Sequence, residues 1–225
     1  MPRPELAALI HGPAELLPIS SSAHASLVGD RESAVGLHLA SAAGLLVGRW
    51  REVAAVLRRL DFRRVAMHLL AGAVPSAAGL LLRRRTPPSP VAGLLVGSAG
   101  LLLADRQAGD RSRWDAGPAD GFWLGVAQAC ALVPGVSRNA ATLVVARLRG
   151  FGPEEANRLS REVGLPVTLG AVALEGRVAP APSAVAFLAT LGALPLLRLV
   201  DRGPLWPWAA YRCVLALVLM RRSHR

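Results

Sequence analysis

The sequence predicts an all-α integral membrane protein with two re-entrant helical hairpins, about six full transmembrane helices and inverted-topology repeats. Three observations lead to this prediction. Charged residues are confined to short segments between long apolar runs. Two polar clusters that contain proline interrupt the apolar pattern. The same order of features occurs on both sides of a charged central segment.

The longest apolar runs have the length of a membrane-spanning helix. Residues 65–82, 86–104 and 178–197 contain no Asp, Glu, Lys or Arg, and about 18–20 apolar residues span a hydrocarbon core of about 30 Å. The alternative is the buried helical core of a soluble protein, but such a core is out of proportion to 225 residues. The runs therefore favour an integral membrane protein.

The positive charge of the chain does not indicate nucleic-acid binding. All 26 basic residues are arginine, and the formal net charge is +11. A nucleic-acid-binding domain gathers its basic residues on one face, whereas these arginines lie between apolar runs. They are typical of topology signals and lipid-headgroup contacts, so we expect the bilayer as a partner and no nucleic acid.

The chain divides into two halves with the same order of elements. Each half begins with a polar cluster in a predicted re-entrant hairpin and continues with three candidate spans. The first half has its hairpin at 4–28 and spans at 34–49, 65–82 and 88–104; the second has its hairpin at 119–147 and spans at about 162–176, 178–197 and 203–220.

An odd number of spans in each half gives the two halves opposite orientations. Polar groups and broken backbone are costly in hydrocarbon, so each cluster must be buried in protein or line a wet cavity. We therefore expect one membrane domain, 1–225, in which both hairpins meet near the midplane. It consists of repeat one at about 1–104, a linker at 105–118 and repeat two at about 119–225.

The distribution of arginine predicts the orientation of the chain. One side receives fifteen arginines, and the other receives nine. The fifteen lie in the segments 49–64, 105–118, 147–161 and 198–202. Positive residues are enriched in cytoplasmic loops, so this side is expected in the cytoplasm and both termini outside.

The first polar cluster, PAELLPISSSAH at 13–24, contains Glu15, Ser20, Ser21 and His24. Ser21 and His24 are three residues apart and share a face of a helical turn. A serine or histidine nucleophile, an acid–base partner and an orienting carboxylate are the components of hydrolysis. Alternatively, the serines cap the helix after the proline and His24 packs in the core.

The second cluster, VPGVSRNAAT at 133–142, places Arg138 next to Ser137, with Thr142 one turn further on. An arginine at membrane depth is costly unless an anion meets it. A guanidinium, hydroxyl groups and the N–H groups of a half-helix form a phosphate cradle, and Gly135 would let the backbone approach a ligand closely. The alternative is a structural ion pair between Arg138 and Glu15, which would join the two hairpins.

The motifs AELLPISSSAH and LVPGVSRNAAT, in this order and at this separation, resemble those of the undecaprenyl pyrophosphate phosphatase family, also called the bacitracin-resistance protein family. The resemblance covers nearly the whole chain. Further matches are LHLASAAGLLVGRW at 37–50, GFWLGVAQACALVPGVSR at 121–138, LPVTLGAVAL at 165–174 and WPWAAYR at 206–212.

The resemblance implies a multi-pass phosphatase of the bacterial plasma membrane, with its active site facing outside. The expected substrate is a polyprenyl pyrophosphate lipid, undecaprenyl pyrophosphate, whose product carries peptidoglycan precursors. We expect Glu15, Ser21, His24 and Arg138 to be catalytic. The residues expected to contact the substrate are Ser20, Ser22, Gly135, Ser137, Asn139 and Thr142. A homo-oligomer is an open alternative to a monomer.

The resemblance also implies a divalent cation, Mg²⁺ or Ca²⁺, beside acidic residues. The family has a second acid four residues before Glu15, and His11 occupies that position here. One carboxylate is a weaker magnesium site than two. Glu15 and His11 are the candidate metal ligands.

The phosphatidic-acid phosphatase type 2 superfamily is excluded, because it requires a lysine-led motif and a histidine after its Ser-Arg pair, and this chain has no lysine and no histidine between His68 and His224. Two alternatives stay open. One is a non-hydrolytic polyprenyl-phosphate translocator of the same fold, because inverted repeats around a midplane site are typical of transporters. The other is a helical membrane protein whose polar clusters are structural.

Overall fold

The computed structural model describes residues 4–28, 34–82, 90–175 and 180–223, and these residues are helical with short connections and no β-strand. The all-α prediction is confirmed. The helices are α1 (Pro4–Leu16), α2 (Ser21–Val28), α3 (Ala34–Gly48), α4 (Trp50–Arg58), α5 (Phe62–Leu82), α6 (Pro90–Asp105), the 3₁₀ helix η1 (Arg113–Asp115), α7 (Pro118–Cys130), α8 (Arg138–Leu148), α9 (Pro153–Glu175), α10 (Pro180–Val200) and α11 (Trp206–Ser223).

Five of the six predicted spans match helices to within a few residues, and the exception is α9. It begins at Pro153, nine residues before the predicted span. Proline is favoured in the first turn of a helix, and Glu154 and Glu155 are favourable there because of the helix dipole. Within the described part of the chain, no helix combines the length and the apolar character of a candidate membrane span.

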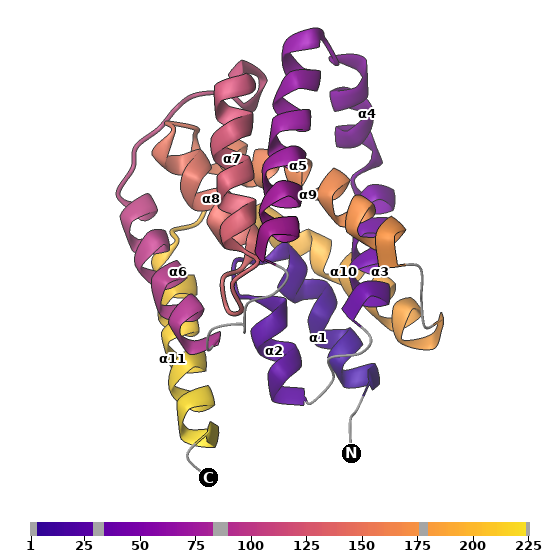
Figure 1. Cartoon of the computed structure of the whole chain (residues 1–225), viewed down its shortest axis with the longest axis vertical. Helices are drawn as coiled ribbons and strands as arrows, with labels where there is room; N and C mark the ends of the chain where they lie inside the picture. Colours follow the sequence, from indigo (N-terminus) through magenta and orange to yellow (C-terminus); the bar gives the residue numbers. More distant parts are fainter. Residues whose placement is uncertain (1–3, 29–33, 83–89, 176–179, 224–225) are drawn as a thin grey trace.

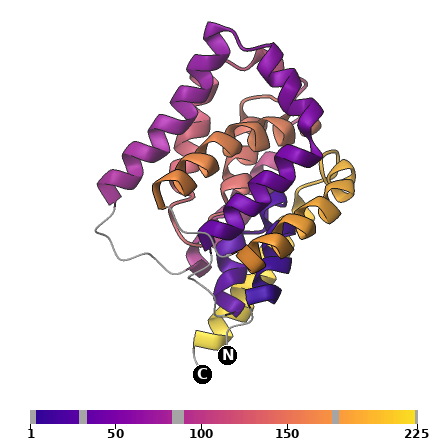
Figure 2. The same ribbon diagram turned by 90° about the vertical axis from the view of Figure 1, so that its right-hand side faces the viewer.

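Two short helical hairpins face each other in the middle of the molecule (Figures 1 and 2). In the first, α1 and α2 are joined at 17–20, and the hairpin opens toward the end where α11 finishes. In the second, α7 and α8 are joined at 131–137, and this hairpin opens toward the opposite end. The connecting segments of both hairpins therefore point inward.

The backbone reverses at each hairpin through a residue with a positive φ angle. These residues are Ser20, with φ of 71°, and Gly135, with φ of 87°. The sequence suggested that Gly135 lets the backbone approach a ligand. In the structure it approaches α6, since an added Cβ would lie 2.0 Å from the carbonyl oxygen of Pro90; contact of Gly135 with a ligand stays a prediction. Glycine is required here by both backbone conformation and packing.

Both reversals are held by one buried arginine, Arg212 of α11, whose side chain is 0% exposed. Its Nη1 donates to the carbonyl oxygen of Pro18 at 3.1 Å, and its Nη2 donates to the carbonyl oxygen of Gly135 at 3.1 Å. A helix break leaves such carbonyl groups without their intrahelical partners. One guanidinium therefore satisfies the backbone of both hairpins at once.

Polar contacts connect the four arginine-rich segments that are predicted to lie on the same side of the membrane. Arg64 donates to the carbonyl oxygen of Arg113 at 3.1 Å, which joins 49–64 to the linker. The backbone N–H of Arg113 donates to Glu155 at 3.0 Å, and Arg202 donates to Glu154 at 2.8 Å. Segments 147–161 and 198–202 are thereby joined to the same group.

The packing of α6 against the second hairpin gives the first testable prediction. A Cβ at Gly93 would lie 2.2 Å from the carbonyl oxygen of Pro134 and 2.7 Å from the backbone nitrogen of Val136. Gly93→Ala should therefore lower the free energy of unfolding by about 1–3 kcal/mol, because main-chain atoms must move apart. Thermal unfolding followed by far-UV circular dichroism measures the change.

Gly192→Ala is the matched control, since nothing lies within 4 Å of a Cβ at this helical glycine. Alanine is a better helix former than glycine, so this variant should be neutral or stabilised. Equal unfolding midpoints for the two variants would contradict the close packing of α6 on the hairpin.

Candidate functional site

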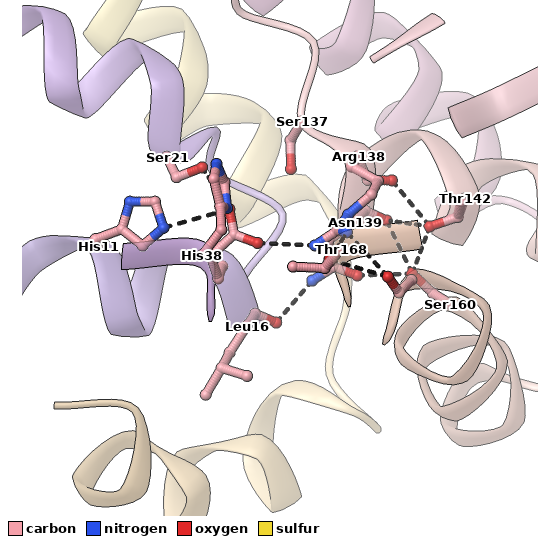
Figure 3. Close-up of polar contacts among 12 residues, drawn as sticks. His11, Leu16, Ser21, His38, Ser137, Arg138, Asn139, Thr142, Ser160 and Thr168 are labelled. Atoms are coloured by element: carbon pink, nitrogen blue, oxygen red, sulfur yellow. Dashed lines mark hydrogen bonds and ion pairs between the residues drawn. The ribbon is translucent and has the colours of Figure 1, made fainter. Parts of the chain in front are cut away.

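The two hairpins bring Glu15 and Arg138 together, although 123 residues separate them. Nη2 of Arg138 donates to Oε2 of Glu15 at 2.8 Å. The ion pair that the sequence raised as an alternative is therefore present, and it joins the two polar clusters (Figure 3). It does not exclude anion binding, since the Arg138 side chain is 27% exposed.

Arg138 is positioned by its place at the start of α8 and by α9. Ser137 is the N-cap of α8, and its hydroxyl accepts a hydrogen bond from the backbone N–H of Ala140. Nη1 of Arg138 donates to the carbonyl oxygen of Gly164 at 3.0 Å and to the hydroxyl of Thr168. Arg138 is thus the first residue of α8, and its guanidinium is held against α9 and Glu15.

Asn139 and Thr142 are buried and connect α8 to its neighbours. Nδ2 of Asn139 donates to the carbonyl oxygen of Leu16 at 2.7 Å. The hydroxyl of Ser160 donates to Oδ1 of Asn139 at 2.8 Å and lies 2.5 Å from the hydroxyl of Thr142. These contacts give both residues a positioning role, while direct contact with the substrate stays a prediction.

The second carboxylate oxygen of Glu15 faces a different set of side chains. The hydroxyl of Ser21 donates to Oε1 at 2.6 Å. Nδ1 of His38 lies 3.2 Å from the same oxygen, and Nε2 of His11 lies 3.9 Å from it. Figure 3 shows His11, Ser21 and His38 on the side of the site away from Thr142 and Ser160.

His24 does not join Glu15, in contrast to the predicted unit of Ser21, His24 and Glu15. Its Nδ1 lies 2.7 Å from the carbonyl oxygen of Ser20, and its Nε2 lies 2.6 Å from the hydroxyl of Tyr211. The imidazole stacks on the Tyr211 ring. The prediction rested on a shared helical face, but α11 packs beside α2 and provides a nearer partner.

The two remaining serines of the first cluster lie around the start of α2. The hydroxyls of Ser20 and Ser22 are 3.2 Å apart. Ser20 is buried and Ser22 is exposed. Of the two, only Ser22 is open to a ligand in this arrangement.

Sequence reasoning missed five polar residues at the centre of the molecule: His38, Ser160, Thr168, Tyr211 and Arg212. A signal existed for two of them. Arg138 and Arg212 are the two arginines that fall inside predicted membrane segments and away from the ends of those segments, and His38 is an ionisable residue inside the predicted span 34–49. Single hydroxyl groups in apolar helices give no comparable signal.

The donor set at Glu15 does not fit Mg²⁺ or Ca²⁺. The metal-binding group found among the described residues consists of His11, Glu15 and His38, whose ligand atoms lie within 4.8 Å of one another. Mg²⁺ and Ca²⁺ prefer oxygen ligands, whereas two of these three donors are imidazole nitrogens. Mg²⁺ or Ca²⁺, which the resemblance implies, would therefore have only one carboxylate ligand in this group, that of Glu15.

The fold and the site are those expected of a helical protein that binds a phosphate group. A helical bundle holds an arginine at a helix N-terminus and a carboxylate in contact with a serine hydroxyl, which is typical of sites for phosphate groups. Comparison with known proteins gives the family. A sequence profile described as "Bacitracin resistance protein BacA" matches residues 6–218. The chain belongs to this family.

Curated relatives cover most of the chain. A protein from Geobacter sulfurreducens named undecaprenyl-diphosphatase is 35% identical, over 91% of this chain and 91% of its own length. A protein of the same name from Geobacter metallireducens is 33% identical, over 90% of this chain and 91% of its own length. A shorter match, 45% identical over 48% of this chain, is to an undecaprenyl-diphosphatase of Anaeromyxobacter dehalogenans.

The buried link between the hairpins gives the second prediction. Asn139→Ala should lower the free energy of unfolding by about 1–3 kcal/mol, because it leaves the carbonyl oxygen of Leu16 without its donor and removes one acceptor of the Ser160 hydroxyl. Ser160→Ala and the double variant complete a double-mutant cycle. Denaturant unfolding should show that the two effects are not additive; strict additivity would contradict a shared network.

Proposed function

We propose that this protein hydrolyses undecaprenyl pyrophosphate to undecaprenyl phosphate and inorganic phosphate. One observation carries the proposal: the carboxylate of Glu15 contacts both the hydroxyl of Ser21 and the guanidinium of Arg138. The substrate follows from the relatives, which are named undecaprenyl-diphosphatases. These names support hydrolysis and give no support to a lipid translocator.

In the proposed reaction, the Ser21 oxygen attacks the terminal phosphorus. Glu15 accepts the hydroxyl proton, for which it is placed by the 2.6 Å hydrogen bond. The new O–P bond forms as the bridging P–O bond of the anhydride breaks, and the lipid phosphate leaves. Arg138 binds the oxygens of the transferred phosphate through its planar donors. Water then hydrolyses the phosphoserine and releases phosphate.

His24 is the alternative nucleophile. A carbonyl oxygen can only accept, so Nδ1 carries a proton toward Ser20; when the ring is neutral, Nε2 accepts from the Tyr211 hydroxyl. Attack by Nε2 would require that this bond be broken first. The direct contact of Ser21 with a carboxylate favours the serine.

An apolar groove beside the site provides a place for the prenyl chain. It has a volume of about 490 Å³ and is lined by side chains of α3, α4, α5 and α9. Leu45, Arg161 and Leu165 line both this groove and a small cavity of about 30 Å³ at Glu15 and Arg138. A lipid could therefore place its pyrophosphate at the ion pair and its chain in the groove.

We place the protein in the bacterial plasma membrane as two inverted repeats, each with one re-entrant hairpin and three spans. Support comes from the opposite directions of the two hairpins and from large apolar side chains exposed along the helices, such as Leu69, Val96 and Val214. The clustered arginine segments support a cytoplasmic location for that end. Recycling of the lipid carrier for peptidoglycan synthesis follows from the proposed reaction.

The third prediction tests Arg138. Arg138→Lys keeps the charge but loses the planar pair of donors, so phosphate release from undecaprenyl pyrophosphate should fall by about an order of magnitude or more. The assay measures inorganic phosphate released by purified protein in detergent. Arg202→Lys is the matched control, because that side chain is 77% exposed at the arginine-rich end. Unchanged turnover in Arg138→Lys would reject its role.

The fourth prediction tests the groove. Leu169 lines it on α9, and Leu169→Trp should fill part of the volume. The KM for undecaprenyl pyrophosphate should rise severalfold, whereas that for a short-chain prenyl pyrophosphate should change little. Leu188→Trp, on an exposed part of α10, is the control. An equal effect of Leu169→Trp on both chain lengths would show that the prenyl chain lies elsewhere.

A further inference from the structure

His11, Glu15 and His38 form a cluster whose donor atoms converge on one point. His11 and Glu15 are one turn apart on α1, and His38 comes from α3. The three ligand atoms lie within 4.8 Å of one another, and the two imidazole rings meet edge to face with centroids 4.6 Å apart. Two helices thus present two nitrogens and one oxygen to the same small volume.

An unsatisfied nitrogen points into this cluster. His11 is only 5% exposed, and among the described residues its Nε2 has no hydrogen-bond partner. Leaving a buried polar atom unpaired costs about 1–3 kcal/mol. The nearest charged group is Oε1 of Glu15, at 3.9 Å, which is too far for a hydrogen bond. In the tautomer that is protonated at Nδ1, the lone pair of Nε2 is available to a ligand in the space between.

We propose that His11, Glu15 and His38 bind a divalent first-row transition-metal ion of the Zn²⁺ class in place of Mg²⁺ or Ca²⁺. Two histidines and one carboxylate are a ligand set used for zinc and for non-haem iron. The replacement of an acid by His11 then changes the metal preference of the site and does not abolish metal binding.

The observed distances are close to those of a metal centre. Zinc lies about 2.0–2.2 Å from nitrogen and oxygen ligands, which puts neighbouring ligand atoms about 3.0–3.5 Å apart. Nδ1 of His38 is already 3.2 Å from Oε1 of Glu15, and Nε2 of His11 is 3.9 Å from it. All three donor atoms lie within 4.8 Å of one another, so a shift of about an ångström, divided between the two imidazoles, would close the site.

The ion pair with Arg138 leaves the metal-binding oxygen free of the guanidinium. Arg138 contacts Oε2, whereas both imidazoles and the hydroxyl of Ser21 face Oε1. A cation bound at Oε1 would therefore lie beside the Ser21 hydroxyl, and Oε2 would remain for the guanidinium. His38 retains 37% of its side-chain exposure, so the site is open for an exogenous ligand.

Metal binding by purified full-length protein tests the inference without reference to turnover. After removal of bound metal by a chelator, titration with Zn²⁺ should show about one site per chain, and Co²⁺ should give the visible absorption of a low-coordinate centre. His11→Gln and His38→Gln should each weaken Zn²⁺ binding by about tenfold or more. Circular dichroism confirms that each variant is folded.

Two further variants sharpen the test. His68→Gln is the matched control, since His68 contacts Arg64 and Glu162 and lies outside the cluster; it should bind Zn²⁺ as the wild type does. His11→Glu should shift the preference toward Mg²⁺ or Ca²⁺, because it provides a second carboxylate.

The inference is overturned if the folded wild type binds no Zn²⁺, or if it binds Zn²⁺ no more tightly than His38→Gln does. His38 is half-exposed, so this variant decides the question even if His11→Gln fails to fold. Hydrolysis is measured separately as phosphate release, so loss of the metal inference leaves the proposed function standing, and the reverse also holds.

Discussion

The structure depends on one constraint: the helices of both hairpins break inside a packed helical bundle. Each hairpin reversal exposes carbonyl groups that no helix satisfies, and a buried carbonyl without a donor is costly. Arg212 resolves both reversals because its guanidinium has several donors in one plane. It bonds Pro18 and Gly135 from opposite halves of the chain. The spacing between the two hairpins is therefore set by the size of one side chain.

That spacing places Glu15 within reach of Arg138, and stability alone does not explain the pair. Removing two charges from water costs several kcal/mol per ion, and apolar side chains of similar volume often serve stability as well or better. Glu15 also contacts Ser21, and Arg138 also contacts Gly164 and Thr168. A carboxylate and a guanidinium oriented by so many partners are preorganised for a ligand.

Much of this arrangement could be predicted from the sequence, because proline, glycine and charged residues stand out against apolar helices. The two polar clusters and five spans were recognised in this way. The sequence pattern does not indicate the start of α9, because Arg161 forms an ion pair with Asp201, 40 residues further along the chain. A pair between residues so far apart cannot be predicted from the neighbouring sequence. The partner of His24 was missed for the same reason: Tyr211 reaches it through the packing of α11, which no helical periodicity specifies.

The charges at the site determine how the carboxylate of Glu15 could bind both Arg138 and a cation. Glu15 and Arg138 carry opposite charges, so the pair can be enclosed without a cation. A second acid at the position of His11 would leave one negative charge, which a metal ion would have to offset. In this chain a bound dication instead adds positive charge beside Arg138, and only an anionic ligand can balance it. If the proposed cation binds, charge balance would couple its binding to the arrival of a pyrophosphate, since each would lower the electrostatic cost of the other.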